Sequence, residues 1–141
     1  MDKTVITNNA RQTQKLGEEL AMNLGANFLA LFGDFGSGKT TFAQGFARGL
    51  RIKERVISPT FVIVREHILK DQTFYHIDLY RVQTADDIEG LGLEEIFNDS
   101  DNIIVVEWAE KIKDSLPKKR MEIYFEHLKE NQRKITFKNY E

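Results

Sequence analysis

Short, uninterrupted apolar runs occur at residues 28–32 and 103–106. Runs of this length without polar interruptions are typical of strands that are buried on both faces of a parallel sheet. The first run is followed by a helical pattern in which Phe42, Phe46 and Leu50 recur every four residues. Buried strands with a helix between them predict an α/β fold in which helices pack on a central sheet.

A second helix is predicted near the N-terminus. Asn9, with Gln12 three residues later, has the capping-box pattern of a helix start. Thr13, Leu16, Leu20 and Leu24 then share one helical face, and Gly25 is the predicted stop. This helix is expected to cover the sheet as a packing layer.

Two antiparallel hairpins are predicted, the second of them from segments with alternating polarity. Residues 61–64 and 73–80 are the arms of the first hairpin, around a turn at 70–72. Residues 121–128 and 134–137 form a closing hairpin near the C-terminus. Together with the two apolar runs, these hairpins predict a mixed, largely parallel central sheet flanked by helices. In such a sheet, a ligand lies at the carboxyl ends of the parallel strands.

Composition limits the number of domains and the classes of function. With 141 residues, of which 41% are hydrophobic and 30% charged, residues 1–141 are expected to form a single globular domain. There is no apolar run of membrane-spanning length and no signal peptide, so we expect a cytoplasmic protein without a membrane partner. The chain has no cysteine, so a metal would be oxygen-ligated Mg²⁺. A net charge of −2 argues against a dedicated nucleic-acid binder.

The loop between the first apolar run and the following helix carries the strongest chemical signal. It fits the phosphate-binding P-loop pattern, Gly, four residues, then Gly-Lys-Ser/Thr. Its residues are Gly33, Asp34, Phe35, Gly36, Ser37, Gly38, Lys39 and Thr40. Glycines let backbone N–H groups approach phosphate oxygens, Lys39 reaches the outer phosphates, and the Thr40 hydroxyl is a ligand for Mg²⁺. The alternative is an ordinary glycine-rich turn, but the flanking strand and helix are the context that the motif requires.

Nucleoside triphosphate binding follows from this loop. The first predicted helix is then either a packing layer alone or also borders the nucleotide base with its N-terminal end. The chain has no Asn-Lys-x-Asp stretch of the kind that reads guanine in many GTPases, which favours ATP. A protein of this class also needs a second acidic group near Mg²⁺, commonly at the end of a buried strand beside the P-loop strand.

Four residues outside the loop are candidates for the chemistry. Glu107 comes directly after the second apolar run, where a carboxylate is costly unless a cation or hydrogen bonds satisfy it; alternatively it caps a neighbouring helix. Asp78 either holds a Mg²⁺-bound water or orients the attacking water, or it forms an ion pair with Arg81. Thr60 lies in a loop that would reach the γ-phosphate, although Ser-Pro-Thr is also a common turn composition. The one tryptophan, Trp108, is a core residue, a lid or a partner contact.

Other polar features carry a weaker signal. Residues 82–101 contain seven acidic residues and neither Lys nor Arg. Such a stretch is either a solvated face or a docking surface for a basic partner. His67, His76 and His127 show no metal-ligand spacing, and the sequence assigns them no role.

Taken together, four motifs in this order resemble the TsaE family, also called YjeE. They are the P-loop with Thr41, then residues 58–61 (Ser-Pro-Thr-Phe), 76–81 (His-Ile-Asp-Leu-Tyr-Arg) and 106–108 (Val-Glu-Trp). The family is the bacterial ATPase required for threonylcarbamoyladenosine modification of tRNA. The resemblance implies a compact P-loop ATPase that is weak alone and acts with TsaD and TsaB. These partners attach the threonylcarbamoyl group to adenosine 37, so tRNA would be met indirectly, through the complex.

The resemblance also implies roles for individual residues. ATP phosphates would be cradled by Phe35 to Thr40 and Mg²⁺ held by Thr40 and Glu107, while Asp78 and Thr60 would serve hydrolysis and switching. The segment Asn9-Ala10, at the start of the first helix, and Arg133 in the last hairpin would contact the nucleotide.

Two other functions remain open from the sequence. A small-molecule kinase would use the same P-loop but needs an acceptor pocket and closing arginines, for which the chain has little room. Direct tRNA binding would use the basic residues Lys111, Lys113, Lys118, Lys119 and Arg120, against a near-neutral net charge.

Overall fold

The structure is a computed structural model that describes residues 2–23, 25–53 and 64–140. Its strands (β), α-helices (α) and 3₁₀-helices (η) follow in the order β1 (Lys3–Thr7), α1 (Ala10–Met22), β2 (Phe28–Phe32), α2 (Lys39–Gly49), β3 (Val64–Ile68), β4 (Thr73–Asp78), η1 (Ala85–Asp87), α3 (Leu93–Asn98), β5 (Asn102–Glu107), η2 (Ala109–Ser115), β6 (Arg120–His127) and β7 (Arg133–Tyr140). None of the helices in these ranges has the length and apolar character needed to cross a membrane.

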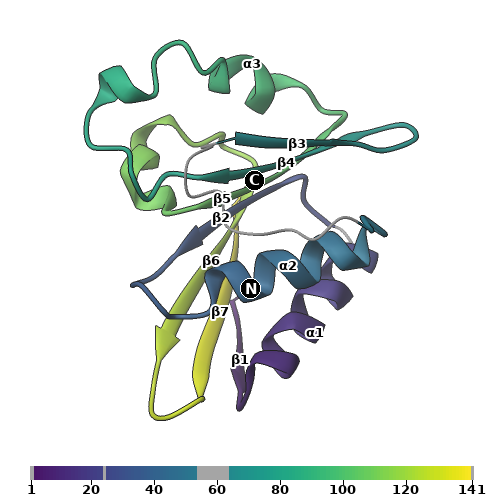
Figure 1. The fold of residues 1–141 in the computed structure, drawn as a ribbon, viewed down its shortest axis with the longest axis vertical. Coiled ribbons are helices and arrows are strands. Elements are labelled where there is room, and N and C mark those ends of the chain that lie inside the picture. The colour runs from purple at the N-terminus through teal and green to yellow at the C-terminus, as the bar shows by residue number, and fades with distance from the viewer. Residues whose placement is uncertain (1, 24, 54–63, 141) are drawn as a thin grey trace.

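The strands of the described chain form one sheet in the order β1-β7-β6-β2-β5-β4-β3 (Figure 1). The four central strands, β6, β2, β5 and β4, run parallel, while β1, β7 and β3 pair antiparallel towards the two edges. The predicted mixed sheet with a parallel centre is therefore confirmed. The two apolar runs form β2 and most of β5, which are neighbours in the sheet and buried at every position.

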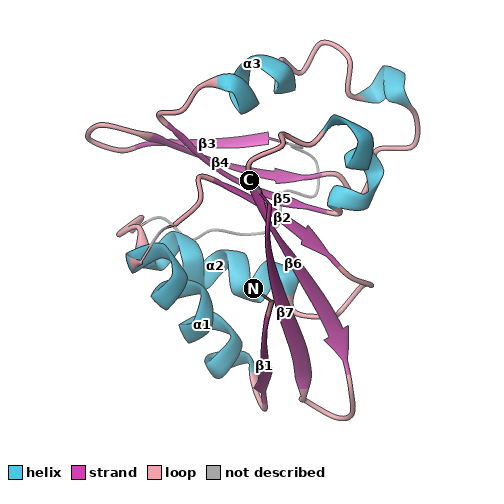
Figure 2. Ribbon diagram, turned by 180° about the vertical axis from the view of Figure 1, so that it is seen from behind, coloured by secondary structure: helices cyan, strands magenta, loops and turns pink. Residues whose placement is uncertain are grey.

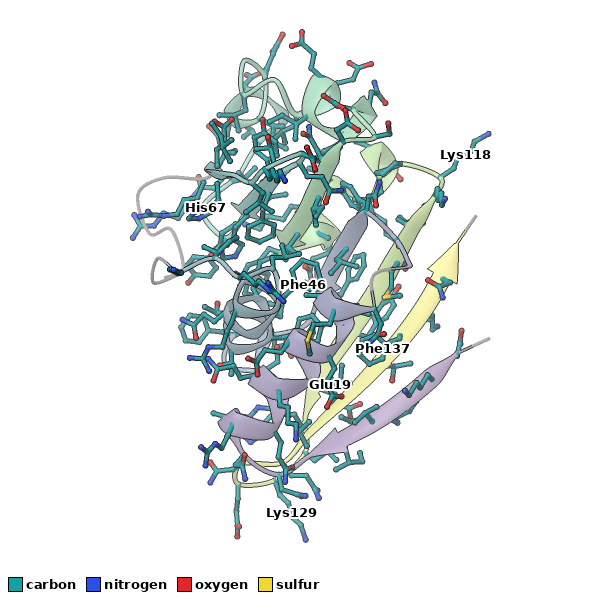
Figure 3. All side chains as sticks on the ribbon, turned by 90° about the vertical axis from the view of Figure 1, so that its right-hand side faces the viewer. Glu19, Phe46, His67, Lys118, Lys129 and Phe137 are labelled. Atoms are coloured by element: carbon teal, nitrogen blue, oxygen red, sulfur yellow. The ribbon has the colours of Figure 1, made fainter. Side chains whose placement is uncertain are left out.

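Helices cover both faces of the sheet (Figure 2), and the buried side chains of the strands belong alternately to the two cores beneath them. In β2, Leu29 and Leu31 face the layer that contains α1 and α2, whereas Ala30 faces α3 and η2 on the other side. Phe46 of α2 is fully buried in the same core as Leu29 and Leu31, whereas Lys118 extends away from the molecule (Figure 3). The period of two along each strand thus decides which strand-end side chains face the P-loop and its helix.

The start of α1 agrees with its sequence signal. The Asn9 side chain accepts a hydrogen bond from the Gln12 backbone N–H at 2.8 Å, as an N-cap does. The reciprocal bond differs from the capping box, because the Gln12 side chain accepts from the backbone N–H of Asn8 at 2.7 Å. The predicted stop at Gly25 is wrong, since the helix ends at Met22 and the next residue has left helical backbone geometry, with φ −123° and ψ 48°.

The helices α1 and α2 cross at very short range through three glycines. A Cβ built on Gly45 would lie 1.9 Å from the carbonyl oxygen of Gln14, and one on Gly17 would lie 2.3 Å from a carbonyl oxygen of α2. Gly49 is similarly close to the backbone of α1, at 2.5 Å. Because backbone faces backbone at all three positions, no side chain there can turn aside to make room.

Both predicted hairpins are present in the described chain. In the first, the turn closes with the Leu69 N–H donating to the Gln72 carbonyl at 2.8 Å. Its second strand ends at Asp78, two residues earlier than predicted, and residues 61–63 of its predicted first arm lie outside the described ranges. The closing hairpin is longer than predicted, and its first strand, β6, also pairs in parallel with β2.

Candidate nucleotide site

The P-loop turns sharply between β2 and α2 and needs glycine at particular points. Gly33 has φ 147° and Gly38 has φ 106°, values that residues with a side chain rarely adopt. At Gly33 a Cβ would also lie 2.6 Å from the carbonyl oxygen of Phe125. Ser37 N–H donates to the Asp34 carbonyl at 3.2 Å and tightens the loop. The loop therefore presents its backbone in the curled form that can surround an anion.

The N-terminus of α2 adds to this preference for anions. The helix begins at Lys39 with Gly38 as its cap residue, which has no side chain to accept from the first N–H groups. Those N–H groups, together with the helix dipole, favour negative charge at this end. Ser37 Oγ is buried and has no hydrogen-bond partner among the described residues. This orphaned hydroxyl and the open helix end fit a phosphate group.

Lys39 is the buried cation of the site, with 4% of its surface exposed. Its Nζ donates to the Gly33 carbonyl and lies 3.5 Å from the centre of the Trp108 ring, a cation–π contact. Burial lowers the pKa of Lys39 below its ordinary 10.5, while nearby carboxylates act in the opposite direction. The ammonium group is thus held at the mouth of the P-loop, where a bound anion would stabilise its charge.

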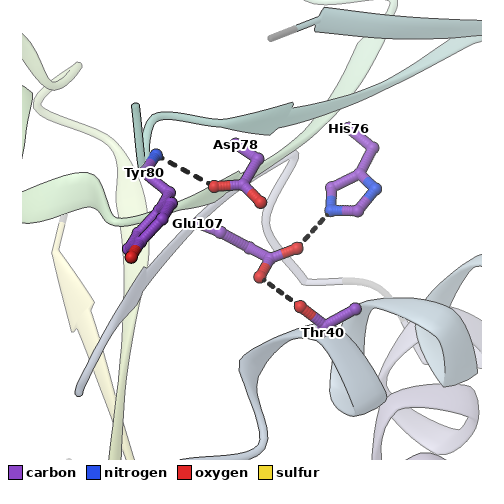
Figure 4. Close-up of polar contacts among 5 residues, drawn as sticks. All are labelled: Thr40, His76, Asp78, Tyr80 and Glu107. Carbon is purple, nitrogen blue, oxygen red and sulfur yellow. Dashed lines mark hydrogen bonds and ion pairs between the residues drawn. The ribbon is translucent and has the colours of Figure 1, made fainter. Parts of the chain in front are cut away.

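Glu107 stands at the end of β5 beside the P-loop strand, where the sequence predicts the second acidic group. It pairs in register with Leu31 of β2 and is 1% exposed. Its Oε1 accepts from the Thr40 hydroxyl at 2.7 Å, and its Oε2 bonds to His76 Nε2 at 2.5 Å (Figure 4). The carboxylate and the hydroxyl are both oxygen donors of the kind that Mg²⁺ prefers, so this pair fits a magnesium ion.

Asp78 occupies the equivalent position on the next strand. It ends β4, pairs in register with Glu107 and is 7% exposed. Its Oδ1 accepts from the backbone N–H of Tyr80 at 3.0 Å (Figure 4). Parallel strands end at the same edge, so the two carboxylates and the P-loop lie together, as the sequence predicts.

The N-terminal part of α1 and the last hairpin approach the loop from the other side. A Cβ on Gly38 would lie 3.6 Å from Thr13 Cγ2 and 3.8 Å from Arg133 Cγ. The structure therefore brings the stem of Arg133 to the P-loop, while Asn9 caps α1 and Ala10 is its first residue. Thr13 was predicted on the shared face of this helix, where it is buried, but no role at the site was predicted for it.

Three aromatic residues line the rim near Lys39. Phe35 of the P-loop is 81% exposed, and its ring centre lies 5.9 Å from that of Tyr80. The Tyr80 ring lies 5.4 Å from Trp108, which is half-buried and packs against the α3 and η2 side of the sheet. Trp108 therefore combines core packing with a cover over Lys39.

Of two further predicted residues, the structure describes only Thr41. Thr41 lies in the first turn of α2 and is half-buried. Thr60 lies outside the described residues, with the whole Ser-Pro-Thr-Phe motif. No role was predicted for His76, but its bond to Glu107 places it within the site.

A buried strand, a glycine loop and a helix in a mixed sheet, with acidic ends on the adjacent parallel strands, define the P-loop NTPase fold class. Comparison with known proteins narrows this class. The family model described as "Threonylcarbamoyl adenosine biosynthesis protein TsaE" matches residues 7–135. The chain belongs to the TsaE family.

Individual relatives agree with this assignment. The tRNA threonylcarbamoyladenosine biosynthesis protein TsaE of Bacillus subtilis is 44% identical over 77% of this chain and 67% of its own length. The protein of the same name from Aquifex aeolicus is 38% identical over 94% and 93%, respectively. The crystal structure of Bacillus subtilis YdiB superposes with a TM-score of 0.81 at 32% identity, covering 100% of this chain and 87% of that one.

Proposed function

We propose that this protein is the ATP-binding and ATP-hydrolysing component of tRNA threonylcarbamoyladenosine biosynthesis. Membership of the TsaE family and the names of its relatives support the pathway. The observation that carries the ATPase activity is the contact of Thr40 with Glu107 across the mouth of the P-loop. This contact joins the two groups that a P-loop ATPase uses for Mg²⁺.

Each residue near the loop has a role in this proposal. The P-loop N–H groups and Lys39 bind the phosphates, and Thr40 and Glu107 hold Mg²⁺. When bound, Mg²⁺ neutralises charge on the β- and γ-phosphate oxygens. Asp78 orients the attacking water at the carboxyl end of β4, and Thr60 acts as a switch residue at the γ-phosphate. Arg133, Asn9 and Ala10 border the nucleotide on the α1 side.

The partners in this proposal are TsaD and TsaB, and the site of action is the cytoplasm. ATP hydrolysis resets their complex between turnovers, and this chain does not itself transfer the carbamoyl group. Hydrolysis by the chain alone is then slow, because its active state is completed by the partners. tRNA is met through the complex rather than by this chain.

The test is a hydrolysis assay with Mg²⁺, for the protein alone and with purified TsaD and TsaB. We expect slow release of phosphate alone and a marked increase with the pair. The matched control is Lys39→Ala, which should bind no ATP because the phosphates lose their buried cation. Hydrolysis that ignores the pair, with phosphate transferred to a metabolite, would instead establish the small-molecule kinase. A rise with tRNA alone would favour direct tRNA binding.

A further inference from the structure

His76 is a fully buried polar residue in an apolar setting. It lies on β4 with no exposed surface, between Phe74, which faces the core under α2, and Asp78 at the strand end. Residues two apart on a strand share a face, so all three point towards α2. The ring is nearly parallel to that of Phe74, with centres 6.5 Å apart. Packing alone would be served equally well by an apolar ring here.

The polar atoms of this histidine are used in an unequal way. Nε2 is bonded to Glu107 Oε2 at 2.5 Å, whereas Nδ1 is buried and has no hydrogen-bond partner among the described residues. A buried polar atom without a partner carries a free-energy cost. The imidazole at this position therefore lowers the stability of the folded protein, and it provides one hydrogen bond to Glu107.

With that bond, the two oxygens of the Glu107 carboxylate each have a different hydrogen-bond partner. His76 occupies Oε2, and Oε1 is left facing the Thr40 hydroxyl (Figure 4). Glu107 is 1% exposed, so water cannot easily replace either partner. Without the histidine, the carboxylate is free to rotate about its terminal bond and to turn Oε1 away from Thr40.

We propose that His76 is a positioning residue that orients Glu107 and thereby sets the affinity of the site for the divalent cation that accompanies the nucleotide. This inference rests on the proposed ATPase function and adds the residue that holds the metal ligand in place. Groups that hydrogen-bond to a metal ligand typically alter metal affinity 10–100-fold when they are replaced.

The experiment measures binding of ATP by calorimetry in EDTA and over a series of Mg²⁺ concentrations. His76→Phe keeps a flat ring beside Phe74 and removes the N–H donor. We expect the Mg²⁺ concentration for half-maximal enhancement of ATP affinity to rise roughly 10–100-fold. The affinity in EDTA should change little, because the hydrogen bond of His76 goes to Glu107, a proposed ligand of the metal, and not to the P-loop.

Two further variants separate orientation from general damage. His76→Gln keeps an amide N–H at about the reach of Nε2, whereas His76→Asn is too short, so Gln should recover much of the Mg²⁺ response and Asn should not. His67→Phe makes the same exchange on β3, where His67 is the cross-strand partner of Phe74 and the two ring centres lie 6.0 Å apart. This variant should match the wild type. Thermal unfolding of each variant reports whether it is folded.

The outcomes are distinct. A folded His76→Phe variant with the wild-type Mg²⁺ response overturns the inference. If the Phe variant does not fold, an equal Mg²⁺ response of the Gln and Asn variants overturns it. Loss of ATP affinity in EDTA and in Mg²⁺ by the same factor also overturns it, because that is the result of structural damage. If the wild-type protein itself binds no ATP, the proposed function fails first, and the inference falls with it.

Discussion

At the scale of single residues, the site sets one buried cation against several carboxylates. Burial lowers the pKa of Lys39, and Glu110, Glu107, Asp78 and Asp34 oppose that shift without cancelling it. Desolvation therefore outweighs the attraction of the carboxylates, and the charged lysine is a local cost to the folded protein. A polyphosphate bound to the loop would supply the additional negative charge that this lysine lacks.

The lowered pKa of Lys39 predicts a pH dependence of stability. Because the folded pKa lies below the unfolded value of 10.5, the unfolded state binds more protons between the two values. The Lys39 contribution to stability is therefore unfavourable at neutral pH and becomes less so as the pH rises towards 10.5. Urea unfolding of the wild type and of Lys39→Met, at pH 7.5 and near 10, should show the wild type gaining relative to the variant. The other lysines cancel in this comparison, so an unchanged difference would contradict the assignment.

Asp78 is the residue for which binding and turnover should separate. In Asp78→Asn the amide oxygen still accepts from the Tyr80 N–H, so the turn after β4 is preserved. The loss of the carboxylate removes the group proposed to orient water. We expect ATP affinity within about twofold of the wild type and turnover reduced roughly 100-fold or more. Parallel calorimetry and phosphate-release assays measure the two quantities, and their joint loss would indicate a structural ion pair instead.

At the scale of elements, two strand ends and one helix start create the site. The apolar runs that form β2 and β5 predicted buried neighbouring strands, and the P-loop and Glu107 follow them directly. The helix α2 is held against α1 by backbone contacts at glycines, which no hydrophobic pattern reveals. The position of the P-loop therefore depends on a crossing that is set by small residues.

Gly45→Ala tests this crossing. Helix propensity alone would favour alanine by about 1 kcal/mol. The new Cβ would, however, lie 1.9 Å from the Gln14 carbonyl oxygen, so α1 and α2 must separate. We expect a net loss of at least about 2 kcal/mol in the free energy of unfolding, measured with urea.

The control for this exchange is Gly25→Ala. A Cβ on Gly25 has no atom within 4 Å, and its stability should stay within about 0.5 kcal/mol of the wild type. A Gly45→Ala variant as stable as this control would show that the helices adjust without cost.

At the scale of the whole molecule, residues from distant parts of the chain meet at the carboxyl ends of the parallel strands. Thr40 and Glu107 are 67 residues apart in sequence and share a hydrogen bond. Arg133 reaches Gly38 from the last hairpin, because β6 pairs with β2 on the side opposite β5. The proposed partners, TsaD and TsaB, would also act at this scale, and the hydrolysis assay measures how their presence alters the site.

The features that local patterns encode could be predicted from the sequence alone. These are the α/β class, the buried strands, the N-cap at Asn9, the P-loop with its helix, and an acid at the end of the strand beside it. Each depends on residues close together in the chain, whose periodicity and turn chemistry act locally. The roles of the site residues in ATP hydrolysis stay predictions, and Thr60 lies outside the described residues.

Only the tertiary structure shows the bond between His76 and Glu107, the approach of Thr13 to the P-loop, and the glycine crossing of α1 and α2. For Arg133 the family resemblance implied a contact with the nucleotide, and the structure shows which part of the P-loop it approaches. These contacts join strands and helices whose order in the sheet no local pattern contains. A histidine that packs in a core and one that bonds to a carboxylate can occupy the same position in the alternating pattern of a strand. The sequence around the histidine therefore cannot distinguish the two. The distinction depends on which strand lies beside it, and long-range packing decides that.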